Sequence, residues 1–159
     1  MLRRLLPALV TVAALVAPAA AVERMAGVTT ERVVVDAMTG LAIGGYDPVA
    51  YFEQGKAVEG RDGFEATWDG AIWRFANAGD RDAFKDTPDL YAPQYGGHCV
   101  TSAAKGVPAE GDPLIFAIAG GRLYLFRGET ERQEWLKAPE RLTSAAEANW
   151  PRIREALPE

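Results

Sequence analysis

The fold is decided by the stretch from Phe64 to Ala76, which reads Phe-Glu-Ala-Thr-Trp-Asp-Gly-Ala-Ile-Trp-Arg-Phe-Ala. Apolar and polar residues alternate on both sides of Asp69-Gly70, and this period of two is typical of a strand with one buried face. Asp-Gly is also a residue pair that two-residue hairpin turns favour. The stretch therefore predicts an antiparallel hairpin in which Trp73 and Phe75 share one face of the second strand.

The rest of the chain predicts a second hairpin and several short helices. Residues 113–119 and 122–126 flank Gly120-Gly121, another hairpin signal. Helices are expected over residues 48–52, 79–85, 98–105, 129–137 and 142–157, the last with an interruption at Trp150-Pro151. No internal repeat is expected. These patterns indicate an α+β fold, one small domain whose antiparallel sheet is built from hairpins with short helices packed around it.

Composition excludes several classes of function. The chain has 159 residues, a formal net charge of -5, one Cys and one His. An acidic balance argues against nucleic-acid binding, which depends on clustered Lys and Arg. One Cys cannot form an internal disulfide or a CxxC pair, and one His with one Cys cannot form a Cys₂His₂ zinc site.

Residues 1–21 have the pattern of a secretory signal. Arg3 and Arg4 precede an apolar run over residues 5–17, and Ala19-Ala20-Ala21 resembles a cleavage site. We expect cleavage near Ala21, a periplasmic or secreted mature protein, and no membrane span within it. The remaining chain divides into a lead-in over 22–45, an α+β domain over 46–128 and a helical extension over 129–159.

Three segments of the chain carry a recognisable pattern. The first is Asp47-Pro48-Val49-Ala50, the second runs from Trp73 to Phe84, and the third is Pro88-Asp89-Leu90-Tyr91. In sequence and spacing they resemble the YHS domain family, and the wider chain is similar to its exported bacterial members, which mostly lack an assigned activity. The resemblance implies an α+β scaffold and metal binding through cysteines. This chain carries Ala50, Ala76 and Asp80 where the family has cysteine, so that metal site does not carry over.

A different cluster, around Tyr95-Gly96-Gly97-His98-Cys99, is the candidate site. His98 is the one imidazole and Cys99 the one thiol, and together these groups suit copper or another soft transition metal. Adjacent side chains diverge, so a metal would need remote partners such as Met38, Asp47, Tyr51 or Asp80. Contacts to a small ligand are expected at Tyr46, Asp47, Tyr51 and Tyr95.

Structural roles are open for the same residues. Cys99 can be a small buried side chain or form an intermolecular disulfide, and His98 can bond a backbone carbonyl. Asp47, which precedes Pro48, suits a helix N-cap better than a catalytic carboxylate. The aromatic residues can line a pocket or build the core, and their alternation favours the core: Tyr46, Tyr51, Trp68, Trp73, Phe75 and Phe84.

The sequence thus predicts an exported YHS-like binding module that holds a metal ion or small ligand near His98 and Cys99 and has no catalysis of its own. The alternatives are an enzyme that uses the thiol or the imidazole, and a structural or interaction protein without a small ligand. The metal, the ligand, any protein partner and the oligomeric state remain open.

Overall fold

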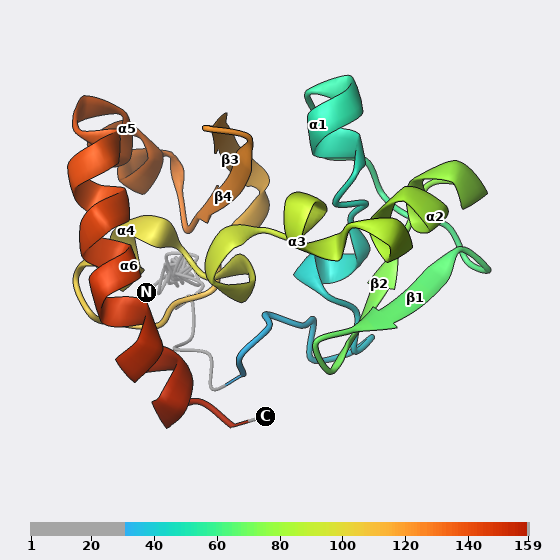
Figure 1. Cartoon of the computed structure of the whole chain (residues 1–159), viewed down its shortest axis with the longest axis horizontal. Helices are drawn as coiled ribbons and strands as arrows, with labels where there is room; N and C mark the ends of the chain where they lie inside the picture. The colour runs from blue at the N-terminus through green and yellow to red at the C-terminus, as the bar shows by residue number, and fades with distance from the viewer. Residues whose placement is uncertain (1–30, 159) are drawn as a thin grey trace, which may run out of the picture.

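Two antiparallel hairpins, each followed by a nine-residue helix, organise the chain (Figure 1). The computed structural model describes residues 31–158, and the predicted signal over residues 1–21 lies outside them. Strands β1 (Glu65–Trp68) and β2 (Ala71–Arg74) form one two-stranded sheet, and β3 (Asp112–Ala119) and β4 (Arg122–Phe126) form the other. The fold is α+β, as the sequence predicts.

The remaining elements are short helices, with one exception. They are α1 (Ala50–Gln54), α2 (Ala78–Asp86), α3 (Pro88–Tyr91), α4 (Val100–Ala104), α5 (Glu129–Lys137) and α6 (Pro139–Ala156), together with the 3₁₀ segments η1 (Ile43–Gly45) and η2 (Gln94–Gly97). In the described part of the chain no helix is long and apolar enough to cross a membrane.

The first hairpin follows its sequence closely. Glu65 pairs with Arg74 and Trp68 with Ala71. Asp69 and Gly70 both have positive φ, 46° and 77°, as a type I′ turn requires, and Gly adopts this conformation at little cost. Trp73 and Phe75 are fully buried, whereas Ile72, which precedes Trp73 and points to the other face, is 43% exposed, so the period of two does set the buried face.

The order of elements occurs twice, although the sequence itself shows no internal repeat. Helices α2 and α5 have equal lengths and follow extended residues, Asn77 and Gly128. They end on residues of closely similar backbone angles, Thr87 (φ −144°, ψ 65°) and Ala138 (φ −155°, ψ 62°). A proline then begins the next helix in each case. We call residues 43–91 unit 1 and residues 95–157 unit 2.

The backbone hydrogen bonds repeat as well. The Asp47 N–H donates to Val58 O at 2.8 Å, and the Cys99 N–H donates to Ala109 O at 2.8 Å. Likewise the Gly60 N–H donates to Gly45 O at 2.9 Å, and Gly111 N–H to Gly97 O at 3.0 Å. Asp47 and Cys99 therefore occupy equivalent positions. The repeat is hidden in the sequence because equivalent side chains differ.

Each unit begins with a left-handed bend of the form X-Gly-Gly. Ile43-Gly44-Gly45 has φ values of 44°, 65° and 80°, and Tyr95-Gly96-Gly97 has 58°, 61° and 88°. The lead-in passes between the bends, because the Val34 N–H donates to Gly96 O at 2.8 Å and Val34 O accepts from the Ile43 N–H at 2.9 Å. Residue 34 thus ties the two units together.

Two buried clusters form the core, and β4 contributes to both. Leu123 and Leu125 pack into the cluster of unit 1, while Tyr124 and Phe126 pack into that of unit 2. Successive strand residues point to opposite faces, so the second sheet lies between the two clusters. Figure 1 shows the same arrangement, with β3 and β4 between α5–α6 and the elements of unit 1.

Two details of the helices differ from expectation. Helix α6 runs through Pro151 without the expected interruption, because Ile153 and Leu157 beyond it are buried in the second cluster and their burial outweighs the missing N–H. In α5 Trp135 is buried, as expected, but Leu136 is 46% exposed. Adjacent residues on a helix point in different directions and cannot both face one core.

Candidate functional sites

His98 is fully buried at the end of η2. Its Nε2 lies 2.8 Å from Glu31 O, and because a carbonyl only accepts, this nitrogen carries the proton. The ring packs against Trp150 with 5.3 Å between centroids. Nδ1 has no hydrogen-bond partner among the described residues. Burial lowers the pKa of His98, which outweighs the opposing bond to Glu31.

Cys99 is also fully buried, but its surroundings are different. It belongs to the apolar cluster of unit 2, with Val100, Tyr124 and Phe126. The thiol is free and enclosed, so the structure gives it the role of a small core residue and leaves it no route to an intermolecular disulfide.

The remote metal partners do not gather around His98 and Cys99. Met38 is 94% exposed, whereas Asp47 is fully buried beside α1 in unit 1. Over residues 31–158 no group of three or more His, Cys, Asp or Glu side chains is placed to hold a metal ion.

The buried Asp47 carboxylate joins two segments of unit 1. Oδ1 accepts from the N–H groups of Val49 at 2.9 Å and Ala50 at 3.4 Å. Oδ2 accepts from the Ala76 N–H at 2.8 Å. Asp47 therefore has the predicted capping role and also connects the start of α1 to the end of the first hairpin.

A second carboxyl group, Asp80, lies beside Asp47 and is only 6% exposed. Asn77 fixes it, because Asn77 Nδ2 donates to Asp80 Oδ2 at 2.9 Å and Asp80 N–H donates to Asn77 Oδ1 at 3.0 Å. Burial, together with the hydrogen bond and charge of Asp80, raises the pKa of Asp47 to about 6. At neutral pH the proximity of Asp47 and Asp80 destabilises the fold, and the backbone N–H groups that donate to Asp47 offset this effect.

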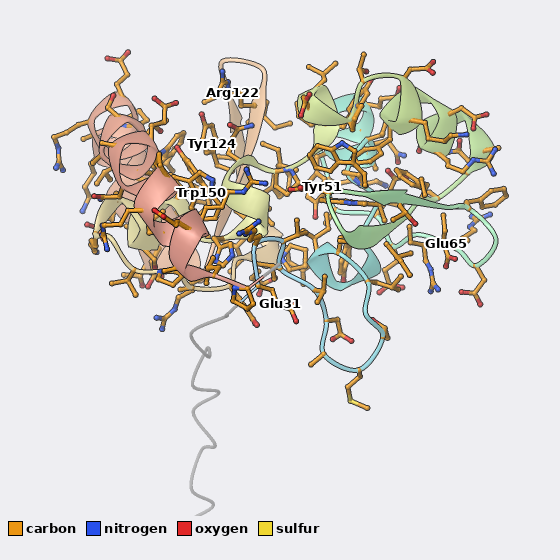
Figure 2. All side chains as sticks on the ribbon, turned by 60° about the horizontal axis from the view of Figure 1, so that its bottom comes forward. Glu31, Tyr51, Glu65, Arg122, Tyr124 and Trp150 are labelled. Carbon is orange, nitrogen blue, oxygen red and sulfur yellow. The ribbon has the colours of Figure 1, made fainter. Side chains whose placement is uncertain are left out.

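The three tyrosines predicted to contact a ligand do not share one pocket. The fully buried Tyr51 donates from its hydroxyl to Pro113 O at 2.9 Å. Tyr46 is half-buried, and burial followed by the charges of Glu59 and Asp112 raises its pKa. Tyr95 belongs to unit 2 and is 7% exposed. Figure 2 shows Tyr51 away from the Trp150 side of the molecule.

Tyr95 does line a cleft of about 350 Å³ that the sequence does not predict. We call it the inter-unit cleft, because its walls come from the lead-in and both units: Arg32, Trp68, Asp69, Tyr95, Trp150 and Arg154. Arg154 Nη2 lies 3.4 Å from Asp69 Oδ1 and so links unit 2 to unit 1 across it. A second hollow of about 560 Å³ shares Arg32 and Asp69 with the cleft.

Both tryptophan rings of the cleft are supported from behind. Trp68 contacts Trp73 and Phe84, each with 5.9 Å between ring centroids. Trp150 contacts Tyr95 at 5.5 Å in addition to His98. The left-handed bend Tyr95-Gly96-Gly97 also requires glycine at position 96, because a Cβ there would overlap the carbonyl oxygen of Arg32.

The cleft shows why its residues escape sequence analysis. Asp69 and Arg154 lie 85 positions apart, and only the packing of the units brings them together. Alternation identifies Trp68 as part of a hairpin, but it does not reveal the neighbouring Trp150. The left-handed φ of Tyr95, a conformation that costs about 1 kcal/mol outside glycine, has no sequence signal except the glycines that follow.

Comparisons of the chain with protein-family models, with curated proteins and with solved structures found no match.

Proposed function

We propose that this chain is an exported YHS-like binding module that takes a small molecule in the inter-unit cleft and performs no catalysis of its own. The observation that carries the proposal is the cleft itself, about 350 Å³ with supported Trp rings and two guanidinium groups in its walls. Ligand pockets occur preferentially where two structural units meet, and volumes of about 300–1,000 Å³ are typical of them.

The cleft adjoins the segment to which the sequence assigns binding. Tyr95 and Gly96 line it, and the ring of Trp150 separates it from His98 by one aromatic contact of 5.3 Å. We assign binding rather than acid–base or thiol chemistry, because the imidazole and the thiol are both fully buried. A group that reacts with substrate must reach it within hydrogen-bond distance.

The arrangement around Asp47 supports the YHS resemblance. The positions at which that family carries cysteine, here Ala50, Ala76 and Asp80, come from separate segments and surround one carboxylate. Such convergence is expected if the scaffold once served a common site. Export is proposed from Arg3, Arg4 and the apolar run, and Edman sequencing of the mature protein tests it: a first residue near Val22 is expected.

Native mass spectrometry of the protein, isolated without denaturation from its export compartment, tests binding. We expect a mass excess that unfolding releases. Arg154→Gln should reduce its occupancy tenfold or more, whereas Arg141→Gln, an exposed position on the same helix, should keep it. Bare protein throughout would overturn the proposal. So would a mass excess equal to a metal ion that is lost in a His98→Ala, Cys99→Ala variant and kept in Arg154→Gln, which would establish the metal-binding alternative.

A further inference from the structure

We infer that the inter-unit cleft selects a small flat ring compound without net charge. This inference rests on the proposed function and specifies its ligand. Three properties of the cleft carry it: the fixed aromatic surface, the balance of charges in the walls and the polar groups at the rim.

The aromatic surface is already oriented before a ligand arrives. Trp68 is held by Trp73 and Phe84, and Trp150 by Tyr95 and His98, all with ring centroids within 5.9 Å. Rings fixed in this way lose little conformational freedom on binding. Offset stacking and edge-to-face contacts contribute about 0.5–1.5 kcal/mol per aromatic pair beyond burial, so the walls favour a π system over a saturated molecule.

The charges of the walls oppose a net charge on the ligand. Arg32 and Arg154 line the cleft together with Asp69 and Asp89, so positive and negative groups are equal in number. A cationic ligand would gain from the Trp faces but would meet two guanidinium groups. An anion would meet two carboxylates, one of which, Asp69, is already paired with Arg154 at 3.4 Å.

The polar groups suit the edge of a ring that both donates and accepts hydrogen bonds. Gln94 lines the cleft, and its Oε1 accepts a hydrogen bond from Arg122 Nη1 at 3.1 Å. Because the oxygen is already engaged, the NH₂ group of Gln94 is the part of the amide that can donate to a ligand. The Arg154 guanidinium is a further donor, and the carboxylates of Asp69 and Asp89 are acceptors. The volume of about 350 Å³ lies at the small end of ligand pockets.

Four probes of similar size test the inference on the full mature protein: adenine is flat and uncharged, benzoate flat and anionic, choline cationic, and glucose uncharged but not flat. We expect adenine to bind at least tenfold more tightly than the others by calorimetry. In NMR spectra adenine should shift the indole N–H signals of Trp68 and Trp150, whereas Trp135, whose Nε1 donates to Thr143 at 3.1 Å, serves as the internal control.

The outcomes separate the two proposals. Preferential binding of benzoate, choline or glucose with shifts at the same two indoles would overturn the inference and support the proposed function. Binding of adenine that leaves the indole signals of Trp68 and Trp150 unshifted would also overturn the inference, and so would the absence of binding by all four probes. Native mass spectrometry of the isolated protein decides the proposed function independently. An Arg154→Gln variant, shown by near-UV circular dichroism to be folded, should lose adenine affinity tenfold.

Discussion

Replacing Asp80 by Asn should make the protein more stable at neutral pH. Asn keeps the shape of Asp80, its oxygen can still accept from Asn77, and its NH₂ can donate to Asp47. In the native protein Asp47 has a pKa of about 6 against 3.8 for the free side chain, a difference that corresponds to about 3 kcal/mol. Burial is the largest cause and Asp80 a smaller one, so we expect the substitution to recover about 1 kcal/mol.

The sign of the pH dependence follows from linkage. A folded pKa raised above the unfolded value gives stability that is complete below about pH 4 and is lost as the pH rises through about 6. His98 acts in the opposite direction, because its folded pKa is lowered and its contribution is lost as the pH falls through that value. Comparing two chains that differ only at Asp80 cancels the His98 contribution.

Urea unfolding between pH 4.5 and 8 measures the effect. We expect the Asp80→Asn variant to gain stability over the original chain as the pH rises, and the gain to shrink toward pH 4.5. Asp82→Asn, an exposed carboxylate on the same helix, is the control and should change stability by less than about 0.5 kcal/mol. A uniform loss of stability for Asp80→Asn at every pH would refute the electrostatic reasoning.

Three further predictions concern the structural repeat and the buried residues His98 and Cys99. Gly60→Ala and Gly111→Ala should each lower the free energy of unfolding by more than about 2 kcal/mol, because a Cβ would lie 2.7 Å from backbone atoms at both equivalent positions. The control Gly79→Ala should lower it by less than about 0.5 kcal/mol. Urea unfolding measures all three variants, and clearly unequal losses for Gly60→Ala and Gly111→Ala would contradict the equivalence of the two units. The Cys99 thiol should react with iodoacetamide only after unfolding, as mass spectrometry can show, and rapid labelling of the folded protein would contradict its burial. His98→Phe should lower the free energy of unfolding by about 1–3 kcal/mol, because it removes the hydrogen bond from the imidazole to the carbonyl oxygen of Glu31. An unchanged thermal midpoint would show that this hydrogen bond contributes little.

Local patterns predicted most of the elements but little of their assembly. Asp69-Gly70 and Gly120-Gly121 mark both hairpins, whereas α6 begins at Pro139, three residues before the start that the sequence predicts. Hairpin turns and helix ends depend on the backbone preferences of a few neighbouring residues, so they can be recognised without the rest of the chain. The continuation of α6 through Pro151 depends on burial of Ile153, a tertiary effect.

In the candidate sites, too, local features could be predicted from the sequence and tertiary contacts could not. The capping role of Asp47 is local, and the sequence predicts it, but its contacts with Ala76 and Asp80 arise only when the hairpin closes over α1. The burial of His98 and Cys99 was one of the alternatives that the sequence left open. Contact between the walls of the inter-unit cleft depends on packing of the two units, which no local pattern encodes.

The most direct test of the inter-unit cleft as a binding site is electron density from crystals of the protein isolated folded from its export compartment. The account predicts density for a small flat molecule in contact with Trp68 and Trp150 and within hydrogen-bond distance of Arg154. A cleft that holds only ordered water, or a metal ion bound at His98 and Cys99 instead, would contradict it.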